Sequence, residues 1–559
     1  MSDMTEARRL ETVYGYHDRT KHHLNRYARS LGYMDWATQP NPFRRFHGAP
    51  LYRLEPPAER EQPTYDALFS GALPAAEPVT ARSLAELFYF SLALSAWKVV
   101  RTPGGRVQAR WSLRVDPSSG NLHPTEGYLI RGPVDGLADA PAVYHYAPFE
   151  HGLELRRKLD VVWWERVEEA LGPEGLLIGL SSIYWREAWK YGERAFRYSN
   201  HDVGHAIGAV TLSAACLGWR TRLIDSVSAR RLAALLGTDQ QEGIEAEHAD
   251  CLLAVTPGPC DAGALADLLA EVPGEAWLGE PNQLSSGHHP WPVIDEVSAA
   301  VESPGLQHEG RPAPASAPVQ PDRGLSAHRI IRQRRSAVAM DGKTRLSREA
   351  FFRLLQRLAP RAVPFTTLPW APAVSLLLFV HRVDGVEPGL YMLVRDPGHE
   401  ASLRKSCHAE FPWRPVEGAP DGVRLFLLAP TDVRHGARTV SCHQEIAAGG
   451  VFAAAMLARF DAALESGGPA MYPRLFWETG LIGQMLYLEA EAAGIRGTGI
   501  GCFFDDAVHE ILGITGHAWQ SLYHFTVGGY VDDPRLETAG AYEHLRVRSE
   551  HGERAWEEA

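Results

Sequence analysis

Residues 326–336 (SAHRIIRQRRS) end in two arginines and a serine that could hold an anion. Ser326 suits a helix N-cap, and the short helix that it predicts would present Arg334, Arg335 and Ser336 together. Guanidinium groups form bidentate hydrogen bonds with phosphate oxygens, so the segment is a candidate phosphate site. The alternative interpretation is a solvated basic helix end.

A second candidate is the loop 117–124 (PSSGNLHP), which follows the strand-like residues 110–115. Two hydroxyls, a glycine and an amide lie between its prolines, in the residues Pro117, Ser118, Ser119, Gly120 and Asn121. A glycine lets a planar ring approach the backbone closely, and the prolines restrict the loop. An ordinary turn is the alternative.

The third candidate is the glycine segment 497–502 (GTGIGC), which contains Ile500, Gly501 and Cys502. Three glycines would leave backbone N–H groups open towards a ligand, and the start of the next helix would add a favourable dipole. The alternative is a plain helix-to-strand connection.

The sequence also contains one module twice. Residues 202–237 and 478–513 align without a gap at a constant offset of 276. The coinciding residues are Gly204/Gly480, Leu212/Leu488, Gly218/Gly494, Arg220/Arg496, Ile224/Ile500 and Gly237/Gly513. Each copy predicts a long helix that ends at a glycine, a short strand, and a second helix that ends at another glycine. The duplication could also be only a pseudo-symmetric scaffold.

Bulk properties narrow the function classes. The chain has 559 residues, 45% of them hydrophobic, which predicts more than one packed domain. A net charge of −12 argues against nucleic acid as the main partner. The apolar run 87–100 is too short to span a bilayer, and residues 1–20 show no secretory signal. Six scattered cysteines suit free thiols, so a cytoplasmic location is expected.

No metal site is predicted. His201 and His205 are four residues apart on a predicted helix, a spacing that can bind zinc, but no third ligand is evident. A structural role is the preferred interpretation of both histidines.

The three candidate segments together resemble the nitroreductase superfamily, in which such elements bind FMN at a dimer interface. Within it, the chain is most similar to the SagB-type azoline dehydrogenases. Four segments carry that closer resemblance, namely 16–45, 117–126 (PSSGNLHPTE), 143–151 (VYHYAPFEH) and 189–205 (WKYGERAFRYSNHDVGH).

The resemblance implies an α+β fold with two tandem nitroreductase-like FMN-binding domains that form an intramolecular pseudo-dimer. The expected organisation is an N-terminal extension (1–79), domain 1 (80–260), a connecting segment with a Pro-rich linker (261–324), domain 2 (325–540) and a C-terminal tail (541–559). The Pro-rich part of the linker is 304–324.

By resemblance, Arg334, Arg335 and Ser336 should hold the FMN phosphate and ribityl chain. Residues 500–502 should lie near flavin N5, the loop 117–121 should reach in from the first copy, and Arg535 matches a late basic residue that often helps with the phosphate. Many relatives carry Arg or Lys where this chain has Val338. In the reciprocal positions the chain has 68–73 (LFSGAL) and 366–370 (TTLPW), so one flavin per chain is expected.

An adjacent Lys-Tyr pair serves as the proton-handling pair in the azoline dehydrogenases, and Lys190 and Tyr191 match it. Such a lysine would need burial to lower its pKa, and the tyrosine could relay a proton. Alternatively, Tyr191 belongs to an aromatic core face from which Lys190 points outwards.

The resulting hypothesis is an FMN-dependent oxidoreductase that oxidises a small heterocyclic or peptide-derived substrate. The alternatives are an NAD(P)H-dependent nitro or quinone reductase and a flavin-binding or flavin-free scaffold for a biosynthetic partner. NAD(P)H or oxygen could be the redox partner. Neither nucleic acid nor a membrane is expected, and the chain could be a monomer or a higher homo-oligomer.

Overall fold

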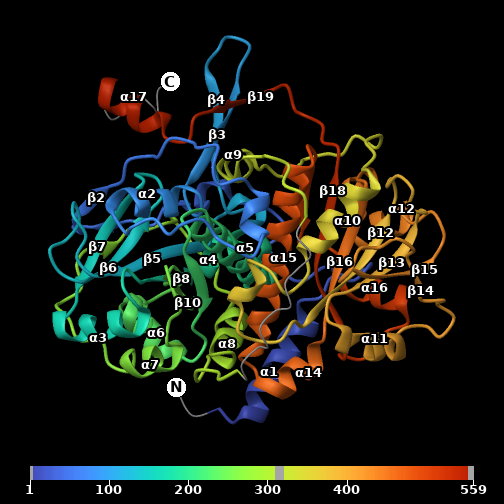
Figure 1. The fold of residues 1–559 in the computed structure, drawn as a ribbon, viewed down its shortest axis with the longest axis horizontal. Coiled ribbons are helices and arrows are strands. Elements are labelled where there is room, and N and C mark those ends of the chain that lie inside the picture. The colour runs from blue at the N-terminus through green and yellow to red at the C-terminus, as the bar shows by residue number, and fades with distance from the viewer. Residues whose placement is uncertain (1–3, 309–319, 552–559) are drawn as a thin grey trace.

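A computed structural model describes residues 4–308 and 320–551. Two halves, each built on a seven-stranded sheet, flank a central pair of long helices (Figure 1). Much of the predicted linker, residues 309–319, lies outside the described residues.

The first half is an antiparallel sheet with helices packed on it. Its strand order is β2-β7-β6-β5-β8-β10-β9. These strands are β2 (Leu51–Arg53), β5 (Thr125–Arg131), β6 (Ala142–Ala147), β7 (Gly152–Lys158), β8 (Leu176–Ser182), β9 (Arg220–Leu223) and β10 (His248–Thr256). The helices are α2 (Ala81–Tyr89), α3 (Val161–Leu171), α4 (Tyr184–Tyr191), α5 (Ala195–Cys216), α6 (Ala229–Leu236), α7 (Ala262–Leu268) and α8 (Pro292–Ala300).

The second half repeats this arrangement in the order β14-β15-β13-β12-β16-β18-β17. Its strands are β12 (Val374–Val380), β13 (Gly389–Val394), β14 (Arg414–Pro415), β15 (Arg424–Ala429), β16 (Phe452–Ala458), β17 (Arg496–Ile500) and β18 (Gln520–Gly528). The helices are α9 (Ala327–Gln333), α10 (Arg348–Arg357), α11 (Glu400–Ser406), α12 (Arg434–Val440), α13 (Glu445–Gly449), α14 (Phe460–Gly467), α15 (Met471–Ala492) and α16 (Asp505–Leu512). The mixed architecture and the two sheet-containing halves agree with the predicted fold class and are compatible with tandem domains.

The offset of 276 residues read from the sequence relates the elements as well. It carries both ends of α5 onto those of α15, and both ends of α6 onto those of α16. Gly237 and Gly513 follow the shorter helices in the left-handed conformation, with φ of 73° and 79°. The predicted helix ends are therefore confirmed, because glycine accepts this conformation without a Cβ penalty.

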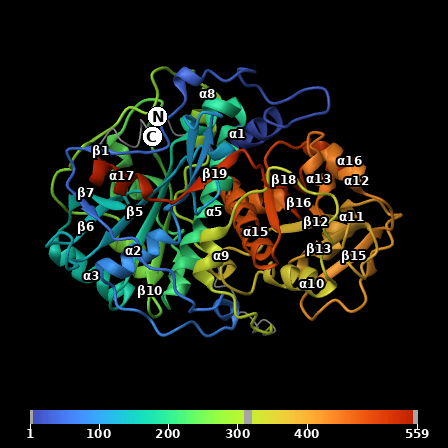
Figure 2. The same cartoon turned by 90° about the horizontal axis from the view of Figure 1, so that it is seen from above.

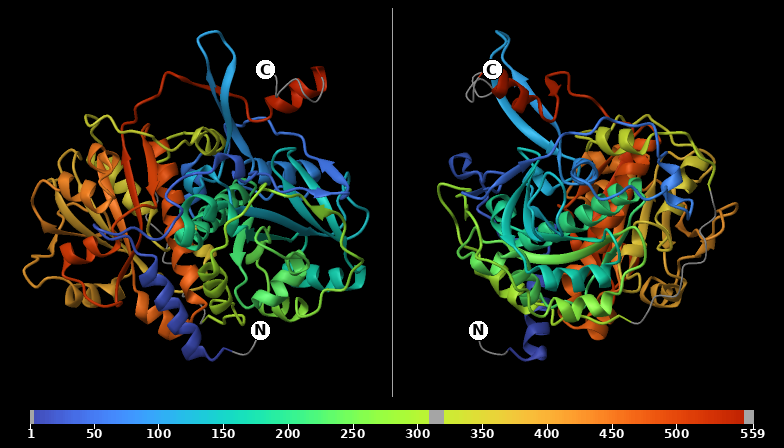
Figure 3. Two further views of the ribbon diagram at one scale, coloured as in Figure 1. Left: turned by 180° about the vertical axis from the view of Figure 1, so that it is seen from behind. Right: turned by 60° about the vertical axis from the view of Figure 1, so that its left-hand side comes forward.

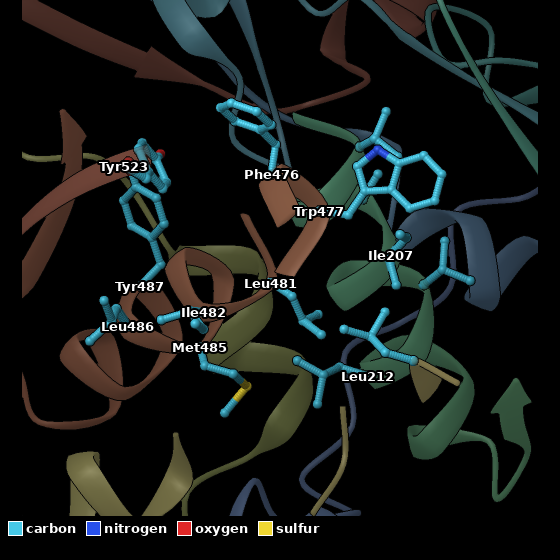
Figure 4. Packing of buried hydrophobic residues seen from close by; sticks show 14 of the residues in the cluster. Ile207, Leu212, Phe476, Trp477, Leu481, Ile482, Met485, Leu486, Tyr487 and Tyr523 are labelled. Carbon is cyan, nitrogen blue, oxygen red and sulfur yellow. The ribbon is translucent and has the colours of Figure 1, made fainter. Parts of the chain in front are cut away.

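Helices α5 and α15 pack directly on each other. A Cβ at Gly204 would collide with the backbone of α15, and a Cβ at Gly480 with that of α5. These two glycines are equivalent under the offset, so the helices cross at related residues. Apolar side chains of α15 such as Leu481 and Met485 fill the surrounding core, which also receives Ile207 of α5 (Figure 4). Burial of each such side chain contributes about 1.5–3 kcal/mol.

The end of the chain returns to the first half. Seen from above, the red C-terminal part of the chain crosses from the second half to the first (Figure 2). Strand β19 (Leu536–Ala539) pairs with β3 (Leu94–Arg101), which forms a hairpin with β4 (Val107–Arg114). This hairpin projects from the body of the molecule (Figure 3). Trp97 Nε1 donates to the Ala541 carbonyl at 3.0 Å, and α17 (Glu543–His551) follows within the predicted tail.

The N-terminal extension joins the two halves. Helix α1 (Glu6–Arg19) packs on α8, and His17 lies 2.9 Å from Gln520 in β18. Further along, β1 (Phe46–His47) pairs with β11 (Glu280–Pro281), and β2 forms an edge of the first sheet. Among the described residues, no helix has both the length and the apolar character needed to cross a bilayer.

Candidate functional site

A cavity of about 910 Å³ lies between the two halves. Every predicted site residue lines it except Lys190 and Arg535. From the first half these are Pro117, Ser118, Ser119, Gly120, Asn121 and Tyr191, and from the second Arg334, Arg335, Ser336, Ile500, Gly501 and Cys502. The fold therefore brings segments separated by up to several hundred residues to one place.

The two arginines form a positive end of the cavity. As expected, Ser326 caps α9 by accepting from the N–H of Arg329 at 3.3 Å, and the arginines follow at the end of this helix. Arg334 donates to the carbonyls of Val115 and Arg114 at 3.1 and 3.0 Å. Arg335 donates only to backbone carbonyls as well.

Within the described part of the chain, neither Arg334 nor Arg335 has a carboxylate within salt-bridge distance. Burial, together with the neighbouring charges of Arg334 and Arg332, lowers the pKa of Arg335 to about 10. A buried cation without a counter-charge is costly. An anion bound at this end would relieve that cost.

Two further cations, which the sequence did not indicate as site residues, extend this end. Lys98 comes from the projecting hairpin and donates to Thr538 Oγ1 at 2.7 Å. Burial lowers its pKa, with smaller effects from Arg335 and Arg496. Arg496 is the first residue of β17, and its Nη1 lies 3.3 Å from Asp532 Oδ1.

The Pro-Ser loop (residues 117–124) is held in place by hydrogen bonds to α5 and β4. Asp202 of α5 accepts from the backbone N–H and the hydroxyl of Ser119, each at 3.1 Å. Asn121 Nδ2 donates to the Ser112 carbonyl at 2.8 Å. Gly120 and Asn121 both have positive φ, of 60° and 61°. The turn therefore needs the conformational freedom that glycine and asparagine provide.

The glycine segment differs from its predicted role in one respect. It is the edge strand β17, which pairs with β18 and meets Ser336 at Gly497, and α16 begins only at Asp505. The N–H of Gly499 is not open, because it donates to the Tyr487 hydroxyl at 3.0 Å. A Cβ at Gly501 would collide with the Tyr198 ring. These glycines let tyrosine rings pack against the strand.

The Lys-Tyr pair lies at the tip of the Pro-Ser loop. A Cβ on Gly120 would be 2.5 Å from the Tyr191 hydroxyl and 3.0 Å from Lys190 Nζ. Lys190 is half-buried and is not among the cavity-lining residues, whereas Tyr191 lines the cavity beside Tyr198, with ring centroids 4.5 Å apart. Burial raises the pKa of Tyr191 well above its usual value, and the nearby Glu187 carboxylate raises it further.

Buried carboxyl groups accompany this pair. Burial raises the pKa of Asp202 to about 7, although hydrogen bonds from Ser118 and Ser119 act in the opposite direction. Burial likewise raises the pKa of Glu187, and Asp202 adds to the shift. Asp116 has a pKa raised to about 6 by burial. No motif in the sequence marked these acids.

The remaining candidate residues lie elsewhere. Arg535 is 82% exposed and pairs with Asp533 Oδ2 at 2.7 Å, outside the cavity lining. His205 lies 3.2 Å from the Tyr523 hydroxyl, and His201 stacks on the Tyr523 ring at 4.2 Å. His205, which was interpreted as purely structural, lines the cavity.

Positions that mirror this cavity under the offset, Asp225 and Arg474 among them, line a smaller cavity of about 370 Å³. Asp225 corresponds to Gly501, and Arg474 corresponds to Tyr198. Arg474 Nε donates to Asp225 Oδ2 at 2.7 Å, and His308 Nε2 lies 2.6 Å from the same carboxylate. The predicted counterpart of the Pro-Ser loop, residues 366–370, contributes Thr367, which donates to the Thr221 carbonyl at 3.2 Å.

Residues 419–530 match the nitroreductase family model. A protein of Methanocaldococcus jannaschii, provisionally named a nitroreductase, is 32% identical over 111 residues. That alignment covers 19% of this chain and 54% of the relative, so the chain spans about half the length of the curated relative it matches.

Among solved structures, a provisionally named nitroreductase from Anabaena variabilis has a TM-score of 0.65 at 22% identity. The match covers 93% of this chain and 99% of that protein, which shows that nearly the whole fold is shared. The E. coli microcin synthetase McbBCD complex matches 36% of this chain and 71% of its own at 16% identity, with a TM-score of 0.25. Its similarity is too low to carry an argument. The family match and the shared fold support the nitroreductase superfamily.

Proposed function

We propose that the protein is an FMN-dependent oxidoreductase that holds one flavin between two halves arranged as an internal pseudo-dimer. The observation that carries the proposal is that Arg334, Arg335, the Pro-Ser loop and the glycine segment all line one cavity. Each half supplies part of the lining of the cavity, so neither half alone would complete the site.

The residues present suit a phosphate-bearing planar cofactor. Arg334, Arg335 and Ser336 would hold the phosphate, since the arginines lack a carboxylate partner among the described residues and offer charge-assisted donors. The glycine segment 497–502 and the loop 117–121 would hold the ring. When bound, the flavin supplies hydride transfer at N5.

The Lys-Tyr pair supports a narrower proposal, namely a SagB-type dehydrogenase that oxidises a small heterocyclic or peptide-derived substrate. Because burial raises the pKa of Tyr191, its phenol stays protonated and can donate or relay a proton. Lys190 Nζ and the Tyr191 hydroxyl both lie beside Gly120. The carboxyl of Asp202, which anchors the Pro-Ser loop, changes charge near pH 7. A substrate that loses a hydride usually also loses a proton, which this group of side chains could accept.

An NAD(P)H-dependent reductase of nitro compounds or quinones is the second candidate. The name of the Methanocaldococcus relative favours it, although that match covers only part of either chain. Oxygen is a further candidate electron acceptor. A scaffold without catalysis is the remaining alternative.

The visible spectrum of the purified protein, with flavin quantified per chain, tests the main proposal. We expect a yellow protein with about one FMN per chain, or one that reaches this ratio on reconstitution. A colourless protein that cannot be reconstituted would overturn the enzyme assignment. Two flavins per chain would instead overturn the single-site arrangement.

Lys190→Ala and Tyr191→Phe separate the two enzymatic candidates. If the chain is a dehydrogenase, both variants should keep FMN and lose most oxidation of a thiazoline- or oxazoline-containing peptide. A reductase should reduce a nitroaromatic compound with NADPH almost as well after either change. Tyr184→Phe, on the same helix α4 but outside the cavity lining, is the matched control.

A further inference from the structure

Two cysteines from distant parts of the second half meet at the cavity wall. Cys442 lies just after α12, and Cys502 lies just after β17. Their sulfur atoms are 2.6 Å apart, against about 2.05 Å in a disulfide bond. Both are free thiols in this structure. Only a small movement would therefore be needed to join them.

The pair is also accessible. Both cysteines are half-buried, and Cys502 lines the cavity, whereas Cys216, Cys251 and Cys407 are buried in the cores. Accessible thiols can react with small molecules, while thiols buried in apolar surroundings are inert.

The backbone at Cys442 is held in an uncommon conformation. Cys442 and the following His443 have φ of 52° and 59°, a left-handed region that residues with a Cβ rarely adopt. Each such residue costs of the order of 1–3 kcal/mol, and such strain clusters at functional sites. Here the strained turn aims the Cys442 thiol at Cys502.

The surroundings shift the pKa values of the two thiols in opposite directions. The hydrogen bond between the two thiols lowers the pKa of Cys502, and the guanidinium of Arg194 lowers it further, against the effect of burial. The same interaction raises the pKa of Cys442. Cys502 is therefore the thiol that ionises first, and the thiolate is the nucleophile in disulfide exchange.

We propose that Cys442 and Cys502 form a redox-active dithiol–disulfide couple in the wall of the cavity, with small-molecule disulfides as exchange partners. The Cys502 thiolate attacks one sulfur of the small disulfide, which releases one thiolate and leaves a mixed disulfide on Cys502. Cys442 then loses its proton and attacks Cys502 Sγ, which releases the second thiol. Two protein thiols are oxidised and one small disulfide is reduced to two thiols.

The new bond would connect the turn after α12 to the end of the glycine strand. Gln444 Nε2 already donates to the Cys502 carbonyl at 3.0 Å, and both residues line the cavity. The redox state of the couple would thus set the position of this wall. The inference rests on the two thiols and their surroundings and does not require that a flavin be bound.

The test uses the full chain, incubated with reduced or with excess oxidised glutathione and then alkylated under denaturing conditions. We expect six alkylated cysteines in the reduced sample, two fewer after oxidation, and one cross-linked peptide that joins Cys442 to Cys502. Full alkylation after oxidation, or a cross-link between other cysteines, would overturn the proposal. This measurement needs no variant and reads the same with or without flavin, so its failure is separate from failure of the proposed function.

Variants define the order of attack. Cys442→Ser should trap glutathione on Cys502 as a mixed disulfide of one glutathione per chain, because the resolving thiol is missing. Cys502→Ser should react at least tenfold more slowly. Cys260→Ser replaces another half-buried cysteine and should form the Cys442–Cys502 bond as the unmodified protein does. Equal glutathione trapping by both single variants would contradict the assigned roles.

Discussion

The cavity and its counterpart occupy positions related by the internal offset, yet they differ in size and in charge. Where the cavity has Gly501 beside Tyr198, the counterpart has Asp225 paired with Arg474. The Tyr198 hydroxyl donates to the Gly501 carbonyl at 3.0 Å, which leaves the local charge unchanged. In the counterpart the Asp225 carboxylate and the Arg474 guanidinium neutralise each other.

The acids at equivalent positions of α5 and α15 differ in the same way. Asp202 anchors the Pro-Ser loop and has no cationic partner among the described residues, and burial raises its pKa. Its equivalent Glu478 also anchors a loop, by accepting from the Ala373 N–H at 2.9 Å, but it is paired with Arg395. A duplicated scaffold can thus keep the loop-anchoring role of an acid in both copies, while only one copy leaves a group free to exchange a proton near neutral pH.

Asp225→Ala, which changes the counterpart, should have the largest effect on the free energy of unfolding. It leaves Arg474 buried without its carboxylate, which should cost about 3–5 kcal/mol in the free energy of unfolding. Urea denaturation measures the loss. Asp139→Ala removes an 87% exposed partner of Lys158 and should leave the free energy of unfolding almost unchanged, because solvent screens exposed ion pairs. Equal losses in the two variants would show that the counterpart is not held by this ion pair.

Asp202→Asn should remove one component of the pH dependence of the free energy of unfolding. Because the folded pKa of Asp202, about 7, lies above its usual 3.8, its protonated form favours folding. Stability should fall as the pH rises from about 4 to about 7 and then level off, by at most about 4 kcal/mol. The asparagine variant should lack this component, so it should gain stability relative to the original protein between pH 5 and pH 8. A stability difference that does not change with pH would contradict the shift.

Arg335→Ala should weaken FMN binding about 10- to 100-fold, since a charge-assisted hydrogen bond contributes roughly 1.5–3 kcal/mol. Titration of flavin fluorescence gives the dissociation constant. Thr366→Ala changes an exposed residue in the counterpart of the Pro-Ser loop and should leave the constant unchanged. Weakening of similar size in both variants would mean that the two regions are less different than proposed.

Thr367→Val should have the smallest effect. It removes the hydrogen bonds of a buried hydroxyl to the Thr221 carbonyl and to Thr211 Oγ1, both at 3.2 Å. We expect a loss of about 1 kcal/mol in the free energy of unfolding and no change in flavin binding. Altered flavin binding would show that the counterpart communicates with the cavity.

Local sequence rules predicted the elements well where the physical cause is itself local. Ser326 caps α9 through a hydrogen bond to a residue three positions along, and Gly513 ends α16 because it accepts a left-handed conformation. The constant offset predicted the repetition of α5 and α15 for the same reason, since the spacing of glycines and apolar residues is read along one segment.

The candidate site was predictable only in its individual segments. The three motifs were visible, but Lys98 joins them because the β3–β4 hairpin lines the cavity, and no local pattern records that contact. Gly499 was expected to offer its N–H to a ligand. It donates to Tyr487 instead, because α15 packs behind the strand.

The sequence by itself determined where helices begin and end, that one module occurs twice, and which arginines, serines and glycines could bind a phosphate. The tertiary structure alone decided that Arg334 is buried and Arg335 half-buried with no acid within salt-bridge distance among the described residues. It alone also decided that Asp225 and Arg474 pair, and that two cysteines sixty residues apart meet. Charge, burial and contact depend on distances through space. A linear pattern constrains such distances only within a turn or two of helix or along one strand.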